Sequence, residues 1–286
     1  MPAIAPAGGF DLIVVPYELA NPRRGMGLGP EHLIASGAES ALGGSGAEVR
    51  TELVELERAP GSEADGCFAL IRAIAERVRS ARDRDALPVV LSGSCFAGVG
   101  VASGLGDPPA VLWFDAHADF NDPESTVSGY LDGMSLAMLT GGAWADRLAA
   151  AEIRPVPESA VVLAGARDLD PGERVRLDRS AITHLAEEEL SPDSLLAALG
   201  QIEGASDDLY VHIDLDVLDA AEARVNRFSS PGGPTAAALA ELVAAVIGSG
   251  RVRALSLTAY DPECDPAGAV PPIAAGLLSL LSRERG

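Results

Sequence analysis

Short apolar runs recur along the whole chain, and stretches with helical periodicity separate most of them. Most of the runs are continuously apolar rather than alternating, which is typical of strands buried on both faces of a parallel sheet. Strands joined through helices in this way predict a single three-layer α/β/α domain over residues 1–286, with a mostly parallel sheet of about eight strands. The expected strands are residues 10–15, 49–56, 87–91, 110–114, 160–164, 181–185, 209–213 and 252–257. The expected helices include residues 63–79, 95–103, 235–247 and 271–282.

The longest stretches without periodicity are residues 16–30, 120–132 and 220–234, and each follows the end of an expected strand. In open parallel sheets, ligands bind outside the carboxyl ends of the strands. We therefore expect these loops to form the walls of a binding site.

Metal-ligand side chains follow two of the expected strands. The strand at 110–114 ends in Asp115, His117 and Asp119, and alternation along an extended backbone points all three side chains to one side. The strand at 209–213 runs into Asp214 and Asp216. A single Asp-x-His could be a strand-end turn with a structural histidine, but carboxylate clusters at two strand ends favour a metal site.

Charge and cysteine content argue against several kinds of partner and of cellular compartment. The net charge of −21 argues against nucleic acid and anionic membranes, because phosphate binding needs clustered Lys and Arg. The odd number of cysteines, 3, does not fit a disulfide framework and indicates a reducing compartment. Neither a signal peptide nor a membrane-spanning run is evident, so we expect a cytoplasmic protein that does not insert into membranes.

Several blocks of the sequence resemble the ureohydrolase family, which comprises arginases, agmatinases and formiminoglutamases, and the resemblance runs over nearly the whole chain. Residues 115–119 and 214–219 are similar to the two signatures of the family, and residues 24–30 to its N-terminal glycine-rich turn. Residues 92–95, Ser-Gly-Ser-Cys, stand where the family has Gly-Gly-Asp-His, and residues 167–173 resemble a segment of the arginase branch.

The resemblance implies a binuclear centre with two manganese ions (Mn2+) per chain. Two divalent ions acidify a shared water and so supply a nucleophile for the guanidino carbon. The implied ligands are Cys95 and Asp115 for the first ion, His117 and Asp216 for the second, with Asp119 and Asp214 bridging. Asp119 is also implied to relay a proton to the departing amine.

Some positions depart from the family pattern. Cys95 replaces the usual histidine ligand, and its softer sulfur would favour Zn or Fe, although the carboxylates and the family favour Mn. Alternatively, Cys95 is a small buried residue beside a one-metal or empty site. Asp132 stands where arginases carry a proton-shuttling histidine, and Ala259 where they carry a glutamate that holds the guanidinium. A carboxyl with an ordinary pKa of about 4 must be shifted to act as an acid at neutral pH, or solvent must replace it.

The amino-acid end of the implied pocket matches the arginase pattern. Neutral donors for an α-carboxylate and carboxylates for an α-ammonium recognise a zwitterion, so an arginine-like small molecule is favoured over agmatine. Taken singly, each of these residues could equally be a loop-capping residue. The positions are Asn121, Thr126 and Ser128 for the carboxylate, Asp170 and Glu173 for the ammonium, and Ser230 beside the guanidino end.

Together these features predict an amidinohydrolase for a modified arginine. The pattern is most similar to the hydroxyarginine amidinohydrolases of D-cycloserine biosynthesis, which cleave N-omega-hydroxy-L-arginine to hydroxyurea and L-ornithine. The alternatives are an arginase acting on L-arginine and a non-catalytic arginase-like binding protein. A cysteine hydrolase with Cys95 as nucleophile is disfavoured, because no histidine follows His212. We expect a monomer, because the chain ends directly after its last apolar helix.

Overall fold

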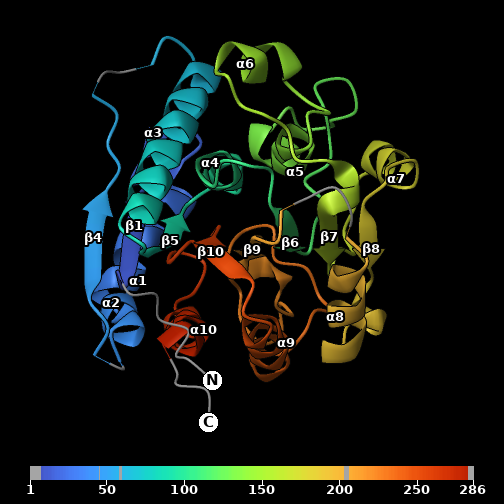
Figure 1. The fold of residues 1–286 in the computed structure, drawn as a ribbon. Helices are drawn as coiled ribbons and strands as arrows, with labels where there is room; N and C mark the ends of the chain where they lie inside the picture. Colours follow the sequence, from blue (N-terminus) through green and yellow to red (C-terminus); the bar gives the residue numbers. More distant parts are fainter. Residues whose placement is uncertain (1–7, 45, 58–59, 203–205, 283–286) are drawn as a thin grey trace.

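The computed structural model describes residues 8–44, 46–57, 60–202 and 206–282. It has three layers, with a central sheet between two layers of helices (Figure 1). The main sheet has 8 strands in the order β4-β1-β5-β10-β9-β6-β7-β8, and every pairing within it is parallel. The predicted fold class is confirmed. Its strands are β1 (Phe10–Val15), β4 (Val49–Leu53), β5 (Leu87–Ser92), β6 (Ala110–Phe114), β7 (Val161–Ala164), β8 (Thr183–Leu185), β9 (Leu209–Asp214) and β10 (Val252–Thr258).

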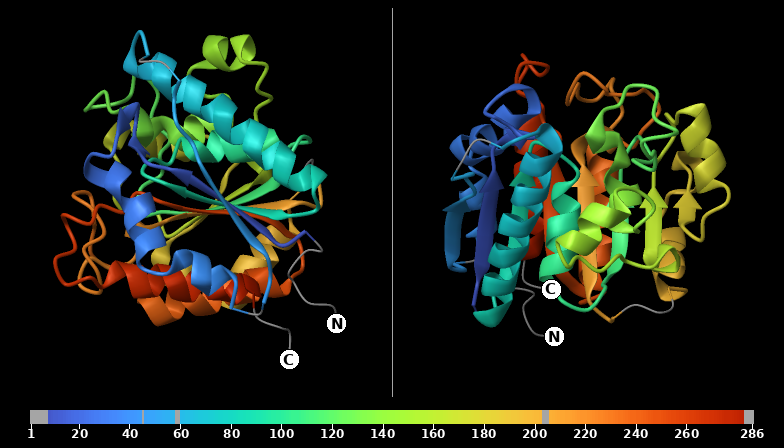
Figure 2. Two further views of the ribbon diagram at one scale, coloured as in Figure 1. Left: turned by 90° about the vertical axis from the view of Figure 1, so that its left-hand side faces the viewer. Right: turned by 90° about the horizontal axis from the view of Figure 1, so that it is seen from above.

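Helices cover both faces of the sheet, as the edge-on view in Figure 2 shows. Each layer has its own apolar core against one sheet face. One layer contains α3 (Glu63–Asp83), α4 (Ala97–Gly104), α5 (Ser135–Leu139), α6 (Ala145–Ala150) and α7 (Pro171–Leu177). The other contains α1 (Gly29–Ala35), α2 (Ala38–Leu42), α8 (Pro192–Gly200), α9 (Ala236–Gly248) and α10 (Val270–Ser282). Among the described residues, no helix is both long and apolar enough to cross a membrane.

Burial along the strands explains their composition. Every residue of β1, β5, β6, β7 and β9 is buried, because helices pack on both sides of these strands. The edge strands β4 and β8 are partly exposed. A small antiparallel pair, β2 (Tyr17–Glu18) and β3 (Asn21–Pro22), lies in the first long loop.

Some predicted boundaries were wrong. The helix expected from residue 95 begins at Ala97, and Cys95 and Phe96 form a turn before it, in which their backbone N–H groups donate to the side chain of Asp132. The strand expected over 49–56 ends at Leu53, whose partner Val14 is near the end of β1. The short helices α1, α2, α5, α6, α7 and α8 were not predicted, because one or two turns carry too little periodicity.

The order of strands places the expected ligands side by side. β5, β10, β9 and β6 are consecutive neighbours in the middle of the sheet and run in the same direction. The register pairs Trp113 with His212 and Thr258 with both Ser92 and Asp214. The carboxyl ends of these strands therefore open on one shared region.

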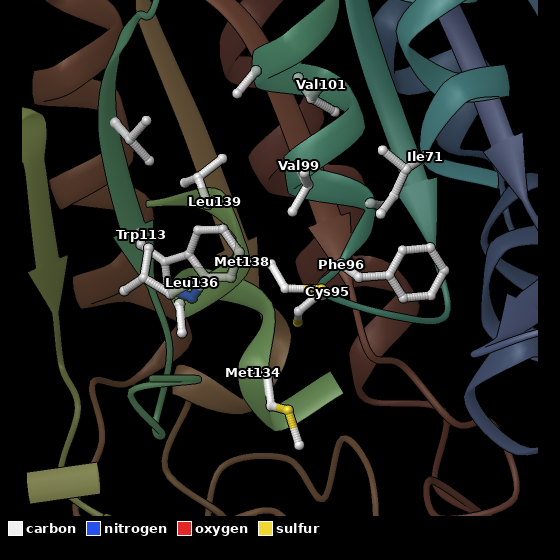
Figure 3. Packing of buried hydrophobic residues seen from close by; sticks show 14 of the residues in the cluster. Ile71, Cys95, Phe96, Val99, Val101, Trp113, Met134, Leu136, Met138 and Leu139 are labelled. Carbon is white, nitrogen blue, oxygen red and sulfur yellow. The ribbon is translucent and has the colours of Figure 1, made fainter. Parts of the chain in front are cut away.

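Close packing of α4 on the sheet supports this region. Figure 3 shows Cys95 and Phe96 at the start of the α4 segment, with Trp113 of β6 nearby. A Cβ added at Gly98 would lie 2.9 Å from Trp113 Cζ3 and 3.0 Å from Tyr210 Oη. Glycine at position 98 thus allows the helix to approach both aromatic side chains.

We predict opposite effects for the same substitution in two helices. Gly98→Ala should lower the free energy of unfolding by ~1–3 kcal/mol, because the added methyl overpacks the contact with Trp113 and Tyr210. Gly276→Ala in α10 should raise it by ~0.5–1 kcal/mol, because nothing lies within 4 Å of the new Cβ and alanine favours the helix. Urea unfolding of both variants measures the two changes, and a stabilised Gly98→Ala protein would contradict the packing argument.

Candidate active site

The predicted metal ligands come together at the carboxyl ends of β5, β6 and β9. The ligand atoms of Cys95, Asp115 and Asp214 lie within 4.8 Å of one another, and so do those of Asp115, His117 and Asp216. Asp119 is in neither group, but it lines the same cavity as His117 and Asp214. The structure therefore brings together residues that are more than a hundred positions apart in the sequence.

Backbone and side-chain donors orient the carboxylates. Asp115 accepts from Trp113 Nε1 at 3.1 Å and from the backbone N–H of His117 at 2.8 Å. Asp214 Oδ1 accepts from the backbone N–H of Asp216 at 2.8 Å. Asn226 Nδ2 donates to Asp216 Oδ2 at 3.1 Å. These bonds fix the carboxylates before any ligand binds.

His117 lies between carboxylates of the two strands. Its Nδ1 is 3.3 Å from Asp115 Oδ1 and 3.5 Å from Asp216 Oδ2. Burial acts to lower the pKa of His117, but the neighbouring Asp216 and Asp115 raise it above its ordinary value. A metal ion beside His117 would replace the proton of the imidazolium as the positive partner of both carboxylates.

Two residues in the cavity wall have a left-handed backbone. Asp119 has φ 49° and Ala259 has φ 63°, and each follows a strand end closely. Such conformations are uncommon for residues with a Cβ, and surrounding structure must hold them. At Asp119 the backbone carbonyl accepts from the N–H groups of Leu136 and Ala137. The turn that aims the Asp119 side chain is thus held by the segment after Asp132.

The site opens into a cavity of about 330 Å³. At one end are Cys95, His117, Asp119, Asp214, Asp216 and Ala259. The expected amino-acid contacts also line it: Asn121, Thr126, Ser128, Asp170 and Glu173. Ser230 is not among the lining residues, so its role at the guanidino end stays a prediction.

Similarity to known proteins identifies the family of this chain. The profile described as "Arginase family" matches residues 9–281. The chain belongs to the arginase family. The ureohydrolase resemblance is confirmed, and the enzymes of this family are amidinohydrolases.

Individual relatives agree with the family. The arginase of Brucella melitensis is 28% identical over 96% of this chain and 96% of its own length. An N(omega)-hydroxy-L-arginine amidinohydrolase from Streptomyces lavendulae is 31% identical over 172 residues, which cover 57% of this chain and 59% of that protein. The solved arginase structure from Bacillus cereus has a TM-score of 0.88 at 22% identity, covering 97% of this chain and 99% of its own, and therefore shows the same fold.

Arginase-family enzymes are binuclear metal enzymes, and the buried residues of this site fit divalent cations. Burial raises the pKa values of Asp115, Asp119 and Asp214, because it removes water from their charged forms. Neighbouring carboxylates raise these pKa values further, because like charges repel. Burial also acts to raise the pKa of Asp216, but His117 and other donors lower it to about 2. Asp216 Oδ1 is buried without a hydrogen-bond partner among the described residues. Divalent ions would offset this charge and use the free oxygen.

Cys95 belongs to one of the groups of side chains that could hold a metal ion. Its side chain is 1% exposed, and its Sγ lies 2.9 Å from Asp214 Oδ2 and 3.1 Å from Thr258 Oγ1. Burial and the nearby carboxylates raise the pKa of this thiol. In this arginase-family site a thiolate therefore requires a cation beside it.

Asp132 is held by the turn that carries Cys95. Its two oxygens accept from the backbone N–H groups of Cys95 and Phe96, each at 3.0 Å, and Ser135 Oγ lies 3.1 Å from Oδ1. Burial raises the pKa of Asp132 to about 6. This carboxylate ties the loop after the first signature to the start of α4.

The residues expected to contact the amino-acid end of a substrate also support their own loops. Thr126 Oγ1 accepts from the N–H of Gly129, and Ser128 Oγ accepts from that of Tyr130. Glu173 accepts from the backbone of Phe120 and Asp170, and burial raises its pKa to about 7. Asn121 Nδ2 donates to Asp170 Oδ2 at 3.2 Å, which links the two sets.

Sequence reasoning missed the residues that join the loops at the mouth of the cavity. Arg227 donates to Glu18 at 2.5 Å, and its guanidinium lies 4.5 Å from the ring centre of Phe228. Tyr130 also donates to Glu18, at 3.0 Å. Glu18 lies in the first predicted loop, Tyr130 in the second, and Arg227 and Phe228 in the third. Their contacts therefore join the three loops into one rim. Aromatic residues within long loops were the available signal in the sequence.

Arg167 was missed as a support for the second signature. Its half-buried guanidinium donates to the carbonyls of Gly165, Asp216, Val217, Leu218, Ser230 and Pro231. It therefore ties the end of β9 to the 220–234 loop. The many carbonyl acceptors are invisible in the sequence, because they are backbone atoms.

We predict that Asp132→Asn destabilises the protein by ~1–3 kcal/mol. An amide supplies a single acceptor, so the N–H of Cys95 or Phe96 would face a donor instead of a carboxylate oxygen. Urea unfolding above the pKa of Asp132 measures the loss. Asp178→Asn, at an exposed position, is the matched control and should change stability little. Equal stabilities of the two variants would contradict a supporting role for Asp132.

Proposed function

We propose that this protein hydrolyses the guanidino group of N-omega-hydroxy-L-arginine to hydroxyurea and L-ornithine. The observation that carries the proposal is Ala259, which brings a methyl group to the cavity wall where a carboxylate would hold a plain guanidinium. N-hydroxylation lowers the basicity of the guanidine, so a missing carboxylate matters less. The partial similarity to the Streptomyces lavendulae hydroxyarginine amidinohydrolase supports the same substrate.

The polar lining supports an α-amino acid as substrate. Asn121, Thr126 and Ser128 offer neutral donors for a carboxylate, while Asp170 and Glu173 offer acceptors for an ammonium. Thr126 and Ser128 lie in the loop that reaches the mouth, away from the buried ligands. This arrangement would orient the guanidino group toward Cys95, Asp119 and Asp214.

In the proposed mechanism, Cys95, Asp115 and Asp214 would help to hold one Mn2+ and His117 and Asp216 a second, with Asp119 as a further carboxylate ligand from the same cavity. When bound, the two ions supply the nucleophile by lowering the pKa of a shared water. Asp119, which lines the cavity after a left-handed turn, would hold a proton there and pass it to the departing amine. The aromatic rim of Tyr130 and Phe228 restricts solvent at the mouth.

Asp132 as the acid for the leaving group stays a prediction. Its position in the cavity lining supports that role, whereas its hydrogen bonds to Cys95 and Phe96 favour a supporting one. Solvent in the cavity is the alternative proton source. We also propose that the protein acts as a monomer in the cytoplasm.

Substrate preference is the direct test. Ornithine release from N-omega-hydroxy-L-arginine and from L-arginine, compared as kcat/KM, should favour the hydroxylated substrate. Ala259→Glu should shift the preference toward arginine by ~10-fold or more, because it restores a charge-assisted hydrogen bond. Ser128→Ala should lower both values alike, because it removes a donor from the shared amino-acid end. A wild-type preference for arginine would overturn the proposed substrate.

Metal content is the second test. Elemental analysis of protein loaded with manganese should find two ions per chain, and chelation should abolish activity and lower the melting temperature. Each ion should stabilise the protein by ~2.7 kcal/mol at a free concentration of 100 times its own Kd. Well-folded protein that binds no divalent ion would instead favour a non-catalytic binding protein.

A further inference from the structure

A buried row of polar side chains leads from the core to the sulfur of Cys95. Tyr210 Oη lies 2.7 Å from Ser256 Oγ, and these atoms lie 2.9 Å and 3.0 Å from His212 Nδ1. His212 Nε2 lies 3.3 Å from Thr258 Oγ1, which lies 3.1 Å from Cys95 Sγ. All these side chains are at most 1% exposed.

The register of the central strands builds this row. Tyr210 and His212 are two apart on β9, so their side chains share a face, and the same holds for Ser256 and Thr258 on β10. Ser256 pairs with His212 across the two strands. Polar groups inside an otherwise apolar layer are costly unless they are hydrogen-bonded, and here each one has partners.

The imidazole in this row has a fixed plane. The ring of Trp113 stacks on that of His212 with centres 3.5 Å apart and an interplanar angle of 11°. The same indole donates to Asp115, a predicted ligand of the first metal. Trp113 thus connects the row to the carboxylate that faces Cys95 across the site.

The hydrogen-bond directions follow from the state of the sulfur. A metal ligand sulfur is a thiolate, which can only accept. Thr258 must then donate to Sγ, and its oxygen can accept from His212 Nε2–H. Nδ1 can accept from Tyr210 or Ser256. The carbonyl of Ile213, 3.4 Å from Thr258 Oγ1, is a more distant acceptor for the same hydroxyl.

We propose that Thr258, held by His212, is a positioning residue that fixes the sulfur of Cys95 as a ligand of the first metal ion. This inference rests on the proposed binuclear function. Sγ lies only 2.9 Å from Asp214 Oδ2, so two anionic ligands would stand side by side there. A hydroxyl donor on the sulfur offsets part of this repulsion and holds the side chain in one rotamer.

Cobalt-loaded full-length protein provides the test. Wild-type protein with Co2+ should show a thiolate-to-cobalt charge-transfer band in the near ultraviolet, and Cys95→Ser should lose it. Thr258→Val keeps the side-chain shape but removes the hydroxyl, so it should shift or weaken the band and lower Co2+ affinity at one site by ~10-fold. Thr258→Ser keeps the hydroxyl and should resemble wild type.

The outcomes separate this inference from the proposed function. An unchanged band and unchanged affinity in folded Thr258→Val would overturn the role of Thr258 and leave the binuclear site standing. Wild-type protein that binds two Co2+ ions without the band would show that Cys95 is not a ligand, which also overturns it. If no Co2+ binds, the proposed function itself fails. Circular dichroism establishes folding, and Thr258→Ala replaces the valine variant if that one does not fold.

Discussion

Buried carboxylates at the ends of neighbouring strands are the constraint on which the rest of this structure depends. Asp115, Asp214 and Asp216 have at most 5% of their surface exposed, and they lie at the ends of β6 and β9, which are neighbours in the sheet. Such a group is costly without compensating cations or protons. The surrounding donors, from Trp113 and Asn226 to backbone amides, orient the oxygens but do not balance the charge. Metal ions would balance the negative charge of the carboxylates and suit the ligand atoms of this site.

The departures from the arginase pattern cluster in space. Cys95 contacts Asp132 through its backbone and Thr258 through its sulfur. Ala259, the next residue after Thr258, lines the cavity beside them. The three positions that depart from the family pattern therefore adjoin one another.

The periodicity of the sequence was sufficient for the fold class, because each central strand is buried on both faces and so reads as a continuous apolar run. Boundaries were less well predicted, as at Cys95 and Phe96, which form a turn before α4 and donate their N–H groups to Asp132. The short helices α5 and α6 give too little pattern to be recognised. The candidate metal ligands could be singled out in the sequence because they adjoin strand ends, and the structure brings them together.

By itself, the sequence determined the class of fold, the family and the group of side chains that meet at the site. Those features depend on residue type and spacing, which the chain carries directly. Only the tertiary structure decided which groups touch: Thr258 on the Cys95 sulfur, Asp132 on two backbone amides, and Arg167 on a set of carbonyls. These contacts depend on strand order and on backbone atoms, and the identity of a single residue specifies neither.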